Sequence, residues 1–230
     1  EAASARLSGV SAPGGPAAIY EPRVWYNPEL RSTQFLVPGL VGFILMITAV
    51  LSTALSVVRE KERGTMEQLR VTALRPAELI LGKTLPYLGI SLAASIVILV
   101  ASRLLFGVVV RGSYGALLIA TLVYLFGALG FGVLVSSLAR SQAMAFQIGI
   151  LSAMLPAIFL SGFIFPIRSM PLPLRLLTRV VPARYYLTLL RGVILKGTGL
   201  GPYVPELLFL VLFAAVMVSL AYARLARRAA

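Results

Sequence analysis

The chain has 230 residues, of which 59% are hydrophobic, and its mean hydropathy is +0.92. A soluble domain of this length is nearer half apolar and has shorter apolar runs, so the composition excludes an ordinary soluble enzyme. Its 21 Lys and Arg residues against eight acidic residues give a net charge of +13. These charges lie between apolar runs and not along one soluble face, which excludes a nucleic-acid-binding protein.

Three residue types that carry much of protein chemistry are missing, since the sequence has no Cys, no His and no Asp. Disulfides, thiolate or imidazole metal ligands and a Ser-His-Asp triad are therefore excluded. An intramembrane protease is disfavoured for the same reason. We predict no catalytic residue, no metal site and no cofactor bound by this chain.

Residues 1–34 are rich in Pro, Gly and Ala, as in SAPGGPAAIYEPRVWYNPELR. We predict that they are the end of an extracytoplasmic segment whose body lies upstream, because the sequence begins with neither Met nor a signal-peptide pattern. Trp25 and Tyr26 would suit an aromatic belt at the membrane boundary, and a plain surface loop explains them equally well.

Five long and almost uncharged runs follow, and a helix needs roughly 20 apolar residues to cross the hydrocarbon core. We therefore predict an all-α, polytopic membrane protein whose transmembrane domain covers residues 35–228. The predicted transmembrane helices are residues 35–58, 84–105, 115–138, 143–166 and 204–223.

The short connections suggest the orientation, because Lys and Arg next to a span favour the cytoplasmic side. The charged segment after the first span and the tail ARLARRAA both adjoin span ends, so we place them in the cytoplasm with the hairpin ARSQ. The total numbers of basic residues on the two sides are nearly equal and do not decide the orientation. With five spans the N-terminus then lies outside, and we expect a sixth span upstream in the full chain.

The spans contain no carboxylate at mid-depth, and Glu206 lies at a boundary. Ion-coupled transporters usually keep an ionisable group or a broken helix there, so any transport is expected to draw its energy from another source. Pro156 is predicted to kink the fourth span. Gly127, Gly130 and Gly132 are predicted to form a small face for close helix contact, typical of ordinary membrane packing.

The segment LILGKTLP ends like a phosphate-binding loop, with Gly82, Lys83 and Thr84 in order. The full pattern needs a further glycine where Ala77 stands, and it should follow a buried strand instead of entering a span. This chain is therefore not expected to bind ATP by that route. We interpret Lys83 as a snorkelling anchor at a helix start.

Arginines between the fourth and fifth spans could suggest an anion site, but their spacing favours amphipathic helices. Arg175 and Arg179 share one helical face, and Arg184 and Arg191 share another after Pro182. Two short helices lying in the membrane interface, or dipping into it, explain both stripes, with headgroup contact as a by-product. The residues assigned to this outer region are Pro166, Arg168, Arg175, Arg179, Arg184 and Arg191.

The segment VVREKERGTMEQLRVTALRP lies between the first two spans and mixes opposite charges. Thr65 and Gln68 form a T-x-x-Q capping box, and Glu67 lies in the first turn, where the helix dipole favours an anion. Met66 and Leu69 fall on one side of this short helix. Mixed charges beside an apolar stripe favour a docking surface for a soluble partner over a polybasic lipid-binding segment, and a solvated loop is the alternative.

The stretch VVREKERGTMEQLRVTALRPAELILGKTLPY resembles the first cytoplasmic loop of ABC-2 type (type-2 exporter) permeases, most closely the bacterial drug-efflux-like subfamily. FLVPGLVGFIL before it, and LSGFIFPIRSMPLPLRLLT and ARYYLTLLRGVILKG after it, match the same family in order. The resemblance covers residues 26–228.

This resemblance implies a six-span subunit that dimerises and pairs with separate ATP-binding subunits, which would hold the ATP and Mg. It makes the segment after the first span the coupling element, with Met66 and Leu69 filling a groove on the ATPase. Residues 168–196 would be the outer re-entrant helices near the exit. The residues assigned to partner binding are Arg59, Glu60, Glu62, Arg63, Gly64, Thr65, Met66, Glu67, Gln68 and Leu69.

The resulting hypothesis is a multi-pass permease subunit in the bacterial cytoplasmic (inner) membrane, exporting a hydrophobic or amphiphilic substrate. The expected partners are an ATP-binding cassette subunit, a second permease protomer in a homo- or heterodimer, and membrane lipid. A periplasmic adaptor is a further candidate, and nucleic acid is not expected. One alternative is a membrane scaffold without transport activity, which the absence of an ATP-binding subunit encoded beside the chain would favour. The other is an ion-coupled carrier, which the missing acidic residues disfavour and which transport without an ATPase partner would support.

Overall fold

The computed structural model describes residues 32–64 and 76–229, and all regular elements in these ranges are helical. The predicted segment 1–34 lies outside the described residues except for its last three. The longer elements are α1 (Ser32–Glu62), α3 (Pro76–Phe106), α4 (Tyr114–Leu138), α5 (Gln142–Gly149), α6 (Leu155–Phe159), α7 (Leu172–Leu177), α8 (Pro182–Arg191) and α9 (Val204–Ala229). The π-helical turns are η1 (Ile150–Met154) and η4 (Gly192–Lys196), and the 3₁₀ turns are η2 (Ile167–Ser169), η3 (Thr178–Val180) and η5 (Gly201–Tyr203).

Five helical stretches of the described chain are long and apolar enough to cross a membrane. They are Leu36–Glu62, Ile80–Phe106, Tyr114–Leu138, Gln142–Phe159 and Gly201–Arg224. The prediction of an all-α polytopic membrane protein with five transmembrane helices is therefore confirmed. Helices α1 and α3 both extend beyond the apolar runs, because backbone hydrogen bonding continues where the side chains become polar.

The fourth span is interrupted between α5 and α6. In the π-turn η1, the N–H of Leu155 donates to the carbonyl of Ile150, five residues earlier. Pro156 follows directly and has no N–H to donate, and a π-turn is one of the recognised ways in which a helix bends at such a point. The helix ends at Phe159 and not at residue 166, and Gly162 turns the chain with a φ of 81°.

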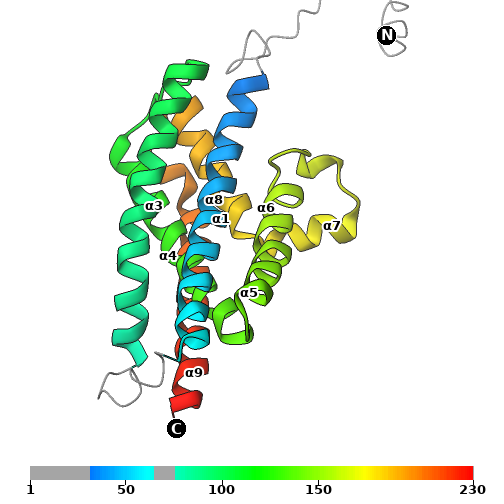
Figure 1. The fold of residues 1–230 in the computed structure, drawn as a ribbon. Helices are drawn as coiled ribbons and strands as arrows, with labels where there is room; N and C mark the ends of the chain where they lie inside the picture. Colours follow the sequence, from blue (N-terminus) through cyan, green and yellow to red (C-terminus); the bar gives the residue numbers. More distant parts are fainter. Residues whose placement is uncertain (1–31, 65–75, 230) are drawn as a thin grey trace, which may run out of the picture. The chain divides into compact units, whose positions relative to one another are not determined.

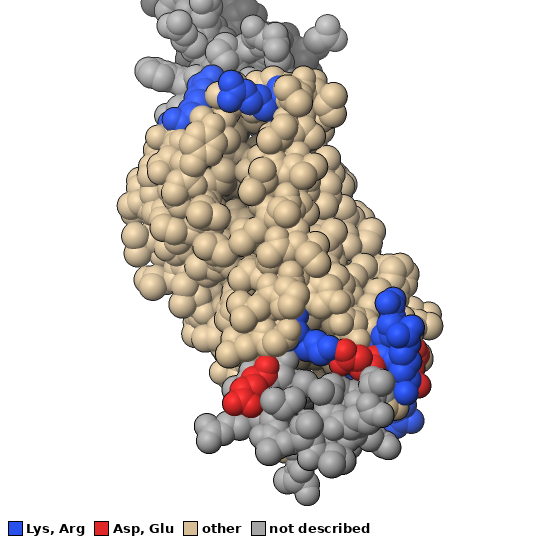
Figure 2. Space-filling view, turned by 60° about the vertical axis from the view of Figure 1, so that its left-hand side comes forward, with Lys and Arg blue, Asp and Glu red and all other residues tan. Residues whose placement is uncertain are grey.

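Helix α4 is the centre of the bundle and contacts α1, α3, α8 and α9 (Figure 1). In its most apolar stretch 61% of the residues are buried inside the chain, against 17% in α3 and 17% in α9. The peripheral helices therefore expose apolar side chains, as a hydrocarbon environment allows. On the face in Figure 2, an uncharged belt separates charged side chains at its two ends.

Small residues set how closely the neighbours approach α4. A Cβ on Gly127 or Gly130 would lie 2.8 or 2.9 Å from side chains of α9. A Cβ on Gly132 would lie 2.7 Å from the backbone carbonyl oxygen of Val50 on α1. The predicted glycine face is thus used for contacts within the chain, with two glycines against α9 and one against α1.

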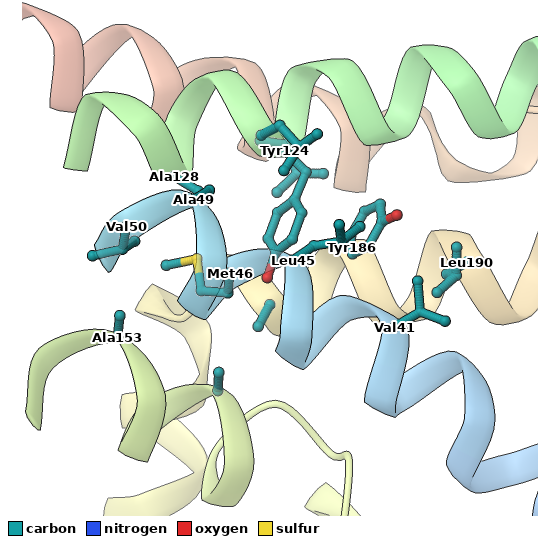
Figure 3. Close-up of a cluster of buried hydrophobic side chains, with 14 of the residues drawn as sticks. Val41, Leu45, Met46, Ala49, Val50, Tyr124, Ala128, Ala153, Tyr186 and Leu190 are labelled. Carbon is teal, nitrogen blue, oxygen red and sulfur yellow. The ribbon is translucent and has the colours of Figure 1, made fainter. Parts of the chain in front are cut away.

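The largest fully buried side chains of the described core are two tyrosines, Tyr124 of α4 and Tyr186 of α8 (Figure 3). Their rings are nearly parallel, with centroids 4.1 Å apart. The Tyr124 hydroxyl donates to the carbonyl of Gly42 at 3.0 Å, and the Tyr186 and Thr121 hydroxyls share a hydrogen bond of 2.9 Å. Both phenols are thus hydrogen-bonded where they are buried, and they tie α8 to α1 and α4.

Candidate functional site

The four charged residues that end α1 contact the ends of three other helices. We call Arg59, Glu60, Lys61 and Glu62 the REKE turn. Figure 1 shows that this turn, the start of α3, the α4–α5 connection and the end of α9 lie at one end of the bundle. A small apolar cluster of Ile80, Val133 and Ala221 packs α3, α4 and α9 together near this end.

Glu62 caps the first turn of α5. Its Oε1 accepts a hydrogen bond from the backbone N–H of Gln142 at 2.8 Å, and its Oε2 accepts one from the Gln142 side-chain amide. Arg59 Nε donates to Gln142 Oε1 at 3.3 Å. Ser141 is the N-cap of α5, and its hydroxyl accepts from the N–H of Met144 at 3.2 Å. Together these contacts satisfy donors that an uncapped helix start would leave unpaired.

The other two residues of the REKE turn contact two further helices. Glu60 forms an ion pair with Lys83 of α3, and Lys61 donates to the carbonyl of Ser136 in the last turn of α4. A cation is favourable at that point, because the C-terminal end of a helix carries partial negative charge. Lys83 thus pairs with an acidic residue, where the sequence had suggested a snorkelling anchor.

The predicted partner-binding residues therefore divide into three groups. Arg59, Glu60 and Glu62 have partners inside the chain, as described above. Arg63 and Gly64 are exposed in the turn that follows α1, and Gly64 has a φ of 72°. Thr65, Met66, Glu67, Gln68 and Leu69 lie outside the described residues, so their predicted capping box and docking role stay predictions.

The predicted outer residues do not form one cluster of contacts. Pro166 and Arg168 are exposed around η2, and Arg175 and Arg179 are exposed on α7 and η3. Every residue of α7 is exposed, including its leucines, whereas α8 buries one face in the bundle. Helices are thus present on both sides of Pro182, but only α8 shows a buried and an exposed face, and Arg179 lies in η3 instead of continuing the helix of Arg175. Their predicted place in the membrane interface stays a prediction.

Two of the outer arginines, Arg184 and Arg191, form hydrogen bonds with the segment between α6 and α8. Arg184 Nη1 donates to the hydroxyl of the buried Thr178 at 2.5 Å. Arg191 donates from both terminal nitrogens to the carbonyl of Gly162, each at 3.2 Å. Burial lowers the pKa of Arg191 to about 10, which leaves it charged at neutral pH.

We expect Arg191→Gln to loosen the turn at Gly162, because a hydrogen bond from a charged donor would be lost. Amide hydrogen exchange in residues 160–167 should become roughly tenfold faster. Arg179→Gln is the matched control, since Arg179 is exposed and should leave that exchange unchanged. Equal exchange in the wild type and Arg191→Gln would show that the contact does not hold the turn.

An apolar groove of about 420 Å³ lies between α3, α4 and α9. Its walls carry no charged side chain, so it suits a hydrocarbon group and offers no acid–base chemistry. The lining residues are Leu88, Leu122, Val123, Phe126, Val211, Ala214 and Ala215. Within residues 32–64 and 76–229, no three His, Cys, Asp or Glu side chains are grouped so that they could hold a metal ion.

The sequence analysis did not identify Gln142, Lys61 or Ser136 as parts of this site. Ser141 before an apolar run was a visible helix-start signal. Nothing in the sequence, however, relates that start to a carboxylate 80 residues earlier.

Comparison with known proteins gives one family. The model of the family described as "ABC-2 family transporter protein" matches residues 11–223. The chain is 37% identical over 213 residues to the probable multidrug ABC transporter permease YbhS of Escherichia coli, a match that covers 93% of the chain and 56% of YbhS. It is 34% identical over 206 residues to the probable multidrug ABC transporter permease YbhR of the same organism, covering 90% of the chain and 56% of YbhR.

A more distant relative is ABC transporter G family member 20 of Dictyostelium discoideum, which is 28% identical over 185 residues. That match covers 80% of the chain and 25% of the relative. The chain thus spans little more than half the length of the two bacterial relatives.

Proposed function

The chain belongs to the ABC-2 family of transporter proteins, and on this premise we propose that it is the membrane-spanning permease part of an ATP-driven exporter. The match over residues 11–223 carries the proposal. Five membrane-spanning helices without a carboxylate at mid-depth support it, because ion-coupled carriers usually keep one there. We further propose that it functions in a bacterial inner membrane, as the Escherichia coli relatives suggest.

The energy would come from a partner. The chain has no complete phosphate-binding loop and no Asp, so we propose that ATP and Mg are bound by a separate ATP-binding cassette subunit. A second permease protomer would complete the transport unit, as a homo- or heterodimer. A periplasmic adaptor and bound lipid stay further candidates.

The proposed substrate is hydrophobic or amphiphilic. The apolar groove between α3, α4 and α9 and the uncharged spans support this, because neither offers a group that would pair with a charged solute. The two Escherichia coli relatives carry "multidrug" in their names.

The proposed partner-binding surface is the segment after α1, with Met66 and Leu69 as its apolar contacts. Arg63 is exposed at its start and is available for a polar contact. The internal partners of Arg59, Glu60 and Glu62 make these three less suited to direct binding, so the surface is expected to centre on residues 63–69.

The test is capture of candidate ATP-binding subunits by the full-length permease. We expect Met66→Glu to reduce capture at least tenfold, because a buried contact would then hold an unpaired charge. Met170→Glu is the matched control, since it makes the same change in the outer connection before α7 and should leave capture unchanged.

Two outcomes would count against the proposal. If no ATP-binding subunit is captured by the wild type, the scaffold and the ion-coupled carrier become the better hypotheses. If Met66→Glu is captured as well as the wild type, the partner binds elsewhere on the permease.

A further inference from the structure

We propose that the REKE turn is a positioning element. It makes the proposed partner-binding surface, residues 63–69, and the cytoplasmic end of α5 move together. Glu62 is its central residue and Gln142 its partner. The inference rests on the proposed function, because it names the route by which a partner's movement would reach a span that is distant in sequence.

The geometry follows from helix periodicity. Successive residues of an α-helix point about 100° apart, so four consecutive residues face all sides of it. Glu60 reaches α3, Lys61 reaches α4, and Arg59 and Glu62 reach the start of α5. One turn of α1 therefore joins the ends of three other helices.

The residue types suit these roles. A carboxylate at a helix start accepts hydrogen bonds from N–H groups that lack a partner in the helix, and it lies at the positive end of the helix dipole. Glu62 has this position at the start of α5. Lys61 meets the negative end of α4 in the same way. Acidic and basic residues of the REKE turn thus meet helix ends of opposite partial charge. This explains why opposite charges follow one another in the REKE turn.

The contacts also have a direction. Residue 65, where the predicted coupling helix begins, is three positions after Glu62 in the chain. Helix α5 leads from Gln142 through η1 and α6 to the turn at Gly162, which Arg191 holds. A displacement of the end of α1 would thus also displace the first turn of α5. The interrupted fourth span would transmit this displacement to the turn at Gly162.

A different role for Glu62 would be direct charge pairing with the ATPase. The two roles differ in their response to substitution. Glu62→Gln keeps an oxygen that can accept from the N–H of residue 142 and an amide that can donate to its side chain. It should therefore preserve positioning, whereas a contact that depends on charge would be lost.

The first measurement is hydrogen exchange at residues 142–145 of the full-length permease in nanodiscs. Glu62→Lys should make it about fivefold faster, the loss typical of a removed N-cap, because a cation then faces the helix start. Adding Gln142→Glu should restore protection, since the introduced ammonium group could pair with the new carboxylate and that carboxylate also favours the helix start. Glu62→Gln should keep most of the protection and exchange clearly more slowly than Glu62→Lys, because it retains both hydrogen bonds and loses only the charge.

The second measurement is the ATPase activity of the captured partner in complex with the same variants. We expect Glu62→Lys to bind the partner normally and to lose at least half of the permease-dependent stimulation. The Glu62→Lys/Gln142→Glu double variant should regain it. This rescue distinguishes positioning from a general loss of folding, because both single substitutions remain in the protein.

Three results would overturn the inference: wild-type exchange in Glu62→Lys, no recovery in the double variant, or loss of partner capture in Glu62→Gln. A wild-type permease that captures no ATPase would instead refute the proposed function. The exchange experiment would still decide whether Glu62 holds α5, because it needs no partner, so the two failures can be told apart.

Discussion

Gly132→Ala is expected to lower the melting temperature of the purified permease by about 5 °C. The new methyl group would lie 2.7 Å from the carbonyl oxygen of Val50, and two helix backbones would have to separate. Overpacking of this kind costs about 1 to 3 kcal/mol, and each kcal/mol shifts the midpoint by roughly 2 to 4 °C at this size. Thermal unfolding in detergent, followed by intrinsic fluorescence, measures the shift.

Gly89→Ala is the control for this experiment. Gly89 lies inside α3, and a Cβ there would meet nothing within 4 Å. Gly132→Ala and Gly89→Ala each raise the helix propensity of their position by about 1 kcal/mol. The two variants therefore differ in the contact that the new methyl group of Gly132→Ala makes with α1. The control should be neutral or slightly stabilising, and an equal melting temperature for the two variants would mean that α1 and α4 are not in close contact at Gly132.

Tyr186→Ala is expected to destabilise the permease by about 3 to 5 kcal/mol, the usual cost of truncating a buried aromatic side chain. Tyr186 is 1% exposed, stacks on Tyr124 and is hydrogen-bonded to Thr121. Its removal leaves a cavity where α8 meets α1 and α4. We expect a large loss of monodisperse protein on size-exclusion chromatography, together with a loss of export by the full-length subunit.

Two further variants separate the ring from its hydroxyl group. Tyr186→Phe keeps the ring and should cost only about 1 kcal/mol, the typical net value of one hydrogen bond. Tyr114→Ala removes a tyrosine that is 63% exposed and should have little effect. If Tyr186→Ala were as stable as Tyr114→Ala, α8 would not be part of the core.

The structure also changes the interpretation of the charges between the first two spans. Their mixture favoured a surface for a soluble partner, and the family resemblance favoured it as well. Arg59, Glu60 and Glu62 in fact contact Gln142 and Lys83 within the chain. Hydropathy and local pattern show that charges are gathered in one segment, but the partners of those charges are found only in three dimensions.

The fourth span illustrates a second limit. An apolar run shows that a segment can lie in hydrocarbon, and residues 141–167 qualify by that criterion. It does not show where the backbone stops being helical. That end depends on the π-turn before Pro156 and on the left-handed conformation of Gly162, which Arg191 holds from 29 residues away.

The sequence by itself determined the class of protein, the five spans found in the described residues and the family, because length, hydropathy and motif order are properties of the chain alone. It also indicated the small face of α4. Only the tertiary structure decided that α4 is central, that Tyr186 carries α8 into the core and that Glu62 caps α5. The physical reason is that each of these depends on which residues meet across a long separation in the chain, and helical periodicity specifies a face without naming its neighbour.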